Sequence, residues 1–153
     1  MLQLRRIALL VSLFGSGCLA TDSAATVEET DFAASLGVDL AASTKGSSGL
    51  YYRDLVAGTG AVVVSGQQLL VHYTGWLANG TQFDSNVAGQ NPYPFQLGAG
   101  EVIQGWDLGI PGMHIGGTRQ LLLPPGVAYG ANGYGTIPGN AVLVFTVEVV
   151  SAQ

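Results

Sequence analysis

Aromatic side chains recur in three apolar stretches of this chain, residues 71–85, 101–106 and 124–130, and the first two stretches each carry one isolated carboxylate. The first stretch contains Tyr73 and Asp84, and the later two contain Trp106 and Tyr129. General acid–base catalysis needs a titratable side chain positioned on the reacting group, and these stretches offer almost no such residues. They predict one aromatic-lined pocket with a chemistry that needs little acid–base equipment.

The chain has few residues suited to metal or nucleic-acid binding. The two histidines, His72 and His114, have no cysteine or acidic cluster at metal-ligand spacing, so neither a metal nor another cofactor is predicted. Charged residues make up 10% of the sequence, and the net charge is −5. Because phosphate contacts need clustered Lys and Arg, nucleic acid is not expected as a partner.

The composition predicts one turn-rich β domain with appended segments. The chain has 153 residues and 23 glycines, which are scattered without a period. The predicted strands, from their β-type runs and turn residues, are 50–56, 69–74, 118–123 and 141–151. The Asn79-Gly80 pair predicts a tight turn between two strands.

One short helix is predicted between Glu101 and Pro111. Val102, Trp106 and Ile110 follow the spacing of one helical face, and Pro111 ends the pattern. An antiparallel sheet with one apolar face needs such a cover, so the predicted fold class is α+β.

The first 17 residues have the pattern of a secretory signal peptide. Arg5 and Arg6 precede an apolar run at 7–14, and small residues follow it. The run is too short to span a bilayer, which takes about 20 apolar residues. We therefore expect an exported, periplasmic protein.

Cys18 is the expected lipidation site, because small residues followed at once by cysteine resemble the bacterial lipobox. The match is imperfect at Gly15, where that pattern usually has an aliphatic residue. The alternative is cleavage after Ala20, which leaves a soluble protein without this cysteine. Residues 18–49 are interpreted as the lipidation site and a flexible linker, with an apolar island at 32–40 that forms a short helix or docks on the domain.

From Leu50 to the C-terminus, the chain resembles the FKBP-type peptidyl-prolyl cis-trans isomerases. Six motifs occur in the family order and at the family spacing: 71–75 (VHYTG), 83–85 (FDS), 101–106 (EVIQGW), 112–113 (GM), 128–130 (AYG) and 143–145 (LVF). Each motif is weak alone, whereas six in register are specific. The resemblance implies that residues 50–153 form a half-barrel of five or six antiparallel strands around one short helix.

The resemblance also implies which side chains form the site. The expected catalytic residues are Tyr73, Phe83, Asp84, Ile103, Trp106, Tyr129 and Phe145, and the expected substrate-binding residues are Tyr93, Val102 and Ile137. Trp106 would be the floor under the proline ring, while the Tyr129 hydroxyl and the Ile103 N–H would bind substrate carbonyls. Asp84 would orient Tyr73 at the pocket edge rather than act as a base.

The implied reaction, rotation about the bond before proline, suits an aromatic pocket. No covalent bond breaks, and the barrier of about 18–20 kcal/mol comes from amide resonance. Twisting the amide removes charge from the carbonyl oxygen, so an apolar cavity favours the twisted state over the planar ones. The alternatives are a periplasmic chaperone or peptide-binding module without turnover, and a small-molecule-binding lipoprotein.

The expected partners follow from the same resemblance. They are proline-containing unfolded or partly folded polypeptides, and macrolide inhibitors of the tacrolimus and rapamycin type. Contact with a membrane is expected only through a lipid on Cys18.

Three positions depart from the family pattern. Gly89 lies where well-studied members carry an arginine that pairs with the pocket aspartate. Tyr134 replaces a histidine often found in the loop 126–139, which we call the flap, and Tyr93 replaces a phenylalanine. Elsewhere, Arg119 is expected to be a solvated residue at a strand edge.

Overall fold

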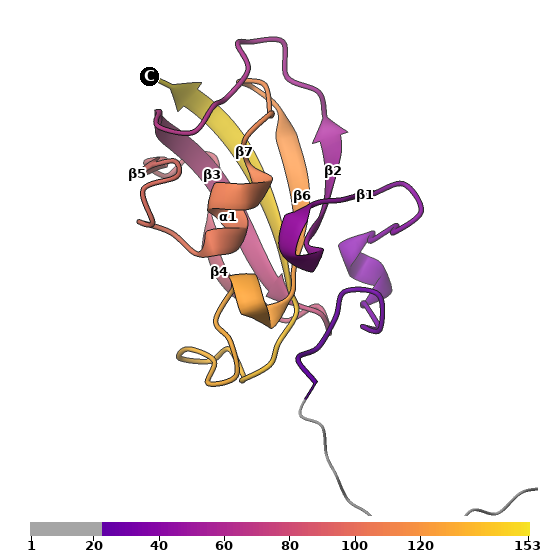
Figure 1. Cartoon of the computed structure of the whole chain (residues 1–153). Coiled ribbons are helices and arrows are strands. Elements are labelled where there is room, and N and C mark those ends of the chain that lie inside the picture. Colours follow the sequence, from indigo (N-terminus) through magenta and orange to yellow (C-terminus); the bar gives the residue numbers. More distant parts are fainter. Residues whose placement is uncertain (1–22) are drawn as a thin grey trace, which may run out of the picture.

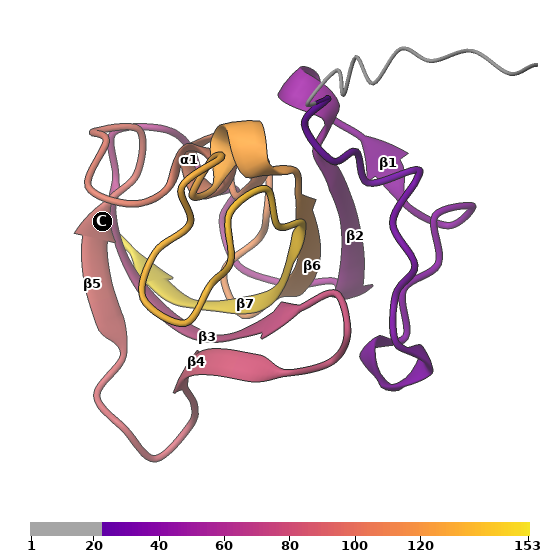
Figure 2. The same ribbon diagram turned by 90° about the horizontal axis from the view of Figure 1, so that it is seen from below.

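The computed structural model describes residues 23–153, so the predicted signal peptide, Cys18 and Ala20 lie outside the described residues. Its seven strands are β1 (Thr44–Lys45), β2 (Tyr51–Val56), β3 (Gln68–Leu77), β4 (Gln82–Asn86), β5 (Tyr93–Gln96), β6 (Thr118–Leu123) and β7 (Leu143–Ala152). They form one antiparallel sheet in the order β1-β2-β6-β7-β3-β4, with β5 paired to β3. The sheet curves around α1 (Gln104–Gly109), as Figures 1 and 2 show, which confirms the predicted α+β half-barrel.

The core lies between the curved sheet and α1. Phe145, Val147 and Val149 alternate along β7 and are buried on the inner face, where they join Trp106 and Ile110 of the helical region. The alternation follows from the two-residue period of a strand, which sends successive side chains to opposite faces. Within residues 23–153, no helix is long and apolar enough to cross a membrane.

Helix α1 is shorter than predicted. It begins at Gln104, because Ile103 has an extended backbone with φ −57° and ψ 144°, and it ends at Gly109. Three short 3₁₀ turns complete the helical elements: η1 (Ala34–Leu36), η2 (Ser47–Gly49) and η3 (Pro125–Val127). A Cβ on Gly105 would lie 2.6 Å from the Leu123 side chain, so this glycine allows α1 to pack closely on β6.

Strand β3 is longer than predicted and reaches the Asn79-Gly80 turn. Gly80 has φ +90°, which favours glycine, and the Asn79 side chain accepts a 3.0 Å hydrogen bond from the Thr81 N–H. The turn therefore forms where the sequence predicted it.

From Ser23 onward the chain packs on the domain rather than forming a flexible linker, and the apolar island at 32–40 docks there, which is one of the two outcomes expected for it. Val27 is fully buried on the outer face of the sheet, in a cluster with Leu122, Val142 and Val144. Other apolar side chains of the segment pack on the same cluster: Ala25, Phe32, Leu36, Val38 and Leu40. Residues 23–49, called the N-terminal segment below, lie against this face because they remove its apolar end from water (Figure 2).

Arg119 is buried rather than solvated. It is 4% exposed, and its guanidinium binds both carboxylate oxygens of Asp54, at 2.6 and 3.1 Å. It also donates to the carbonyls of Gly109 and Pro111 and lies 4.5 Å from the centroid of the Tyr52 ring. Arg119 therefore ties the end of α1 to β2 and β6.

Candidate active site

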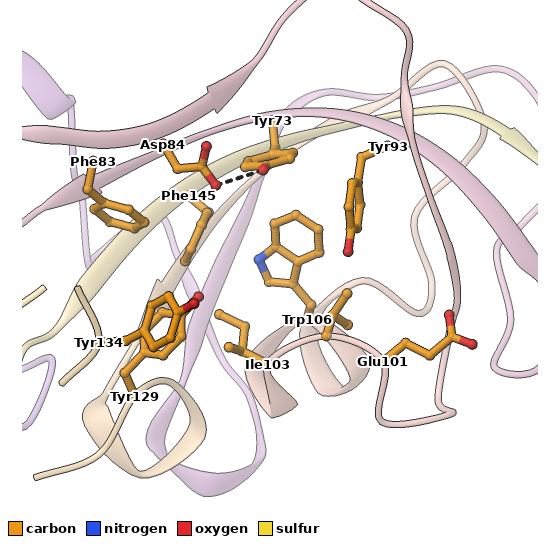
Figure 3. Close-up of a pocket in the computed structure, with 11 residues that line it drawn as sticks. Tyr73, Phe83, Asp84, Tyr93, Glu101, Ile103, Trp106, Tyr129, Tyr134 and Phe145 are labelled. Atoms are coloured by element: carbon orange, nitrogen blue, oxygen red, sulfur yellow. Dashed lines mark hydrogen bonds between the residues drawn. The ribbon is translucent and has the colours of Figure 1, made fainter. Parts of the chain in front are cut away.

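One cavity of about 440 Å³ opens on the inner side of the sheet, between α1, β5 and the flap (Figure 3). It is lined by Tyr73, Phe83, Asp84, Tyr93, Glu101, Val102, Ile103, Trp106, Tyr129, Tyr134 and Phe145. Of the ten side chains expected from the sequence, all except Ile137 line this cavity. The curvature of the sheet brings them together, because they come from four strands, the helix and two loops.

Trp106 forms the floor of the cavity and is held by a ring of aromatic contacts. Its ring centroid lies 5.0 Å from Tyr73, 5.4 Å from Phe145 and 5.6 Å from Phe95. The first two pairs are near-perpendicular, an edge-to-face geometry that aromatic rings favour. The buried indole N–H has no hydrogen-bond partner among the described residues, and Figure 3 shows the indole nitrogen on the side of the Phe145 ring.

Gly75 makes room for one wall of the cavity. A Cβ at this position would lie 2.7 Å from both the Phe83 and the Phe145 ring. Without a side chain there, the two rings meet edge to face with centroids 5.5 Å apart. The glycine of the 71–75 motif thus has a packing role that spacing alone did not predict.

Asp84 is held at the cavity edge by two hydrogen bonds. The Tyr73 hydroxyl donates to its Oδ2 at 2.7 Å, and the Ser85 N–H donates to its Oδ1 at 2.8 Å. Burial raises the pKa of Tyr73, and the bond to Asp84 raises it further, so this hydroxyl stays protonated near neutral pH. Gly89 lies in an exposed loop after β4, and no basic side chain lines the cavity among the described residues.

The flap contributes two stacked tyrosines. The Tyr129 and Tyr134 rings are 5.5 Å apart at 17°, and Tyr134 is 71% exposed. Burial raises the pKa of Tyr129, and the nearby Asp84 carboxylate raises it further. The only hydrogen bond drawn among the lining residues in Figure 3 joins Tyr73 and Asp84, which leaves the Tyr129 hydroxyl without a partner in that set.

Ile137 is the exception to the predicted site. Two backbone hydrogen bonds with Tyr134, at 3.0 and 2.8 Å, turn the flap back on itself. This places Ile137 among the buried core residues, in the wall of a neighbouring hollow of about 210 Å³ that also touches Phe83 and Tyr129.

Sequence reasoning did not assign Glu101 and Tyr134 to the pocket. Glu101 begins a recognised motif, and its Oε2 accepts a 2.8 Å hydrogen bond from the Gln96 N–H, which fixes the bend before α1. Tyr134 was noted only as a replacement in the flap. Within the described part of the chain, no group of three His, Cys, Asp or Glu residues is arranged to hold a metal ion.

Three comparisons with known proteins agree with this geometry. Residues 60–150 match the family model described as FKBP-type peptidyl-prolyl cis-trans isomerase. A protein of Neisseria meningitidis serogroup B named FK506-binding protein is 48% identical over 103 residues, which are 67% of this chain and 94% of the relative. A Dictyostelium discoideum relative, FK506-binding protein 2, is 49% identical over 87 residues, 56% of this chain and 65% of the relative.

Solved structures match as well. The crystal structure of AtFKBP13 is 41% identical with a TM-score of 0.67, covering 72% of this chain and 98% of that one. The crystal structure of FkpA from Escherichia coli is 35% identical with a TM-score of 0.67, covering 73% of this chain and 52% of that one. With its fold, its aromatic cavity and these matches, the chain belongs to the family of FKBP-type peptidyl-prolyl cis-trans isomerases.

Proposed function

We propose that this isomerase accelerates rotation about X–Pro bonds in exported proteins as they fold. The observation that carries the proposal is the cavity itself, whose floor is a buried indole and whose walls are aromatic. Such a cavity binds a proline ring and provides little solvation for the charge of a planar amide. It therefore stabilises the twisted amide relative to the planar forms, which is the requirement for catalysis of a bond rotation.

The lining residues divide the work as follows. The proline ring lies on the Trp106 indole, and the Tyr129 hydroxyl donates a hydrogen bond to a substrate carbonyl. The N–H of Ile103, just before α1, holds a second carbonyl. Asp84 keeps Tyr73 in place and provides negative charge at the edge of the cavity, without taking a proton. Hydrogen bonds from these two donors hold the substrate in one orientation, so that rotation starts from a fixed geometry.

The same cavity is the site we propose for macrolides of the tacrolimus and rapamycin type. Support comes from the Neisseria meningitidis relatives, which are named FK506-binding protein. A macrolide bound there excludes a proline peptide, so we expect competitive inhibition of isomerisation. An inhibitor that leaves the activity unchanged at saturating concentration would contradict this part of the proposal.

Export and a membrane anchor are proposed from the N-terminal pattern. The basic start, the apolar run and the small residues before Cys18 support cleavage there and lipidation of the cysteine. Ala25 lies seven positions after Cys18, a reach of roughly 25 Å at most. A lipid on Cys18 would therefore keep the domain close to the membrane surface, whereas cleavage after Ala20 would release it into the periplasm.

Two measurements test the proposal. The first follows cis/trans isomerisation of a short X–Pro peptide with residues 23–153, which include the N-terminal segment. A rate no higher than the spontaneous one, with the fold intact, would favour a peptide-binding module over an enzyme. The second is mass spectrometry of the mature N-terminus in the native host, where an unmodified start at Thr21 would rule out the lipid anchor.

A further inference from the structure

Two backbone hydrogen bonds meet at Gly130 and close the stem of the flap, one from its N–H to the Pro125 carbonyl at 2.9 Å and one from Asn140. The Asn140 N–H donates a 2.8 Å hydrogen bond to the Gly130 carbonyl, and Gly130 directly follows Tyr129 of the cavity. Asn140 has φ +60°, a left-handed conformation that asparagine tolerates better than most residues. The backbone at Asn140 therefore helps to fix the direction in which the flap joins the start of β7.

The N-terminal segment contacts this stem on both sides. The Ala25 N–H donates a 3.0 Å hydrogen bond to the Asn140 side-chain Oδ1. Ala24 and Ala25 also share a surface cleft with Pro124 and Gly126, where the chain enters the flap. Two residues further along, Val27 is fully buried against the start of β7, so this contact has a fixed base.

The rest of the segment is fastened to the sheet at several distant points. The Ala33 N–H donates to the Ala78 carbonyl at 2.8 Å, and the Gln120 side chain donates to the Leu36 carbonyl at 2.9 Å. Glu28 accepts hydrogen bonds from Lys45 at 2.6 Å and from the Tyr51 hydroxyl at 2.9 Å. Because these anchors lie on the sheet or in the turn directly after β3, the segment can hold the stem of the flap against a rigid frame.

We infer that Asn140 is a positioning residue for the reaction, and that through its bond with Ala25 the N-terminal segment sets the placement of Tyr129 in the cavity. This inference rests on the isomerase activity alone and not on export or lipidation. Neither residue lines the cavity, so neither belongs to the groups that touch substrate.

Two variants each remove one side of the bond. Asn140→Gly deletes the acceptor while keeping a residue that suits positive φ, and Ala25→Pro deletes the donor. Each should raise KM for an X–Pro peptide about fivefold, the effect of one lost hydrogen bond, with kcat changed less than about twofold. Asn140→Asp keeps the oxygen acceptor and should restore KM, and Ala24→Pro controls for proline in the exposed segment.

The double variant and hydrogen exchange separate positioning from general damage. If one bond is responsible, Asn140→Gly with Ala25→Pro should raise KM no more than either single change. The Tyr134 and Ile137 amides of the flap should exchange about fivefold faster in Asn140→Gly, while amides in β3 keep their wild-type rates. The exchange readout needs no enzymatic activity. An unchanged KM and unchanged flap exchange in Asn140→Gly, or KM effects that multiply in the double variant, would overturn the inference.

Discussion

Tyr73 and Asp84 are joined by a 2.7 Å hydrogen bond across neighbouring strands β3 and β4. Tyr73 is paired with Asn86, so Asp84 is its diagonal neighbour on the same side of the two-stranded unit. Tyr73→Phe keeps the ring against Trp106 and removes only this bond. We expect a loss of about 1 kcal/mol in the free energy of unfolding and a several-fold lower kcat/KM, because Asp84 is no longer fixed. Denaturant unfolding and a peptide assay measure the two effects.

The same bond predicts how stability depends on pH. The pKa of Tyr73 is raised in the folded chain, first by burial and then by Asp84, whereas in the unfolded chain it is about 10. The folded state therefore holds this proton more tightly, and the stabilisation is complete below pH 10 and is lost as the pH rises through the folded-state pKa. The stability difference between wild type and Tyr73→Phe should be constant from about pH 7 to 9 and shrink above about pH 10. A constant difference up to pH 11 would contradict the assignment.

A substitution of Asp84 should change the activity of the site while leaving the stability of the fold nearly unchanged. Its side chain lies at the exposed edge of the cavity, so Asp84→Ala should change the free energy of unfolding by no more than about 1 kcal/mol. We expect its kcat/KM to fall about tenfold, because it loses both the charge and the acceptor for Tyr73. Asp84→Asn keeps an acceptor oxygen, and its kcat/KM should lie between those of wild type and Asp84→Ala. Full activity in Asp84→Ala would remove this residue from the mechanism.

At Phe145, the effect of a substitution on activity cannot be separated from its effect on stability. It is 3% exposed and packs between Phe83 and Trp106, so Phe145→Ala should lose about 3–5 kcal/mol of stability. Its cavity role and its core role depend on the same packing contacts. Lost activity in this variant says little about catalysis unless the protein is shown to be folded.

The fold and most of the cavity could be predicted because local patterns and family motifs agree there. The alternation of β7 and the turn at Asn79-Gly80 each depend on neighbours in sequence, and the motifs fix the remaining spacing. Ile137 lies in the neighbouring hollow because its direction depends on two hydrogen bonds across the flap, which no local pattern records.

Long-range contacts explain the two larger errors. Arg119 looked like an edge residue, yet Asp54, 65 positions away, neutralises it in the interior. The N-terminal segment looked too polar to fold alone. It has no core of its own, and it is ordered by the apolar outer face that β6 and β7 present to it.

The charge around the cavity predicts a substrate preference. Asp84 and Glu101 line it, and among residues 23–153 no lysine or arginine does. A peptide with lysine next to the X–Pro bond should therefore have a kcat/KM about threefold higher than one with glutamate, and salt should reduce the difference. Gly89→Arg should lessen the preference, with Gly89→Ala as the control for strain at φ +100°. Equal rates for both peptides at low salt would contradict the prediction.

The packing of Val27 predicts that the N-terminal segment stabilises the whole domain. Val27→Asp places an unpaired charge in a fully buried site beside Leu122 and Val144, and should lower the free energy of unfolding by several kcal/mol. Val38→Asp is a milder comparison, since Val38 is only partly buried in the same cluster. A chain that begins at Lys45 lacks Val27 altogether, and its free energy of unfolding should fall by as much as that of Val27→Asp. Thermal unfolding of the three proteins checks the order, and an unchanged Tm for the truncated chain would contradict it.

Arg119 and Asp54 form the one ion pair among the described residues in which a partner is almost fully buried. Asp54→Ala leaves the buried Arg119 guanidinium without its carboxylate, and should destabilise the fold by about 1–3 kcal/mol, because Asp54 is itself 47% exposed and two carbonyls remain bound to the guanidinium. Arg119→Lys keeps the charge but loses the two-point contact and the contact with the Tyr52 ring, so we expect a substantial loss there too. Arg119→Met fills similar space without a charge. The double variant that combines it with Asp54→Ala should therefore be more stable than Asp54→Ala alone, because no buried charge remains. A double-mutant cycle followed by denaturant unfolding tests this order. If Asp54→Ala alone were as stable as wild type, the buried guanidinium would be satisfied by the carbonyls of α1 and the Tyr52 ring without the carboxylate.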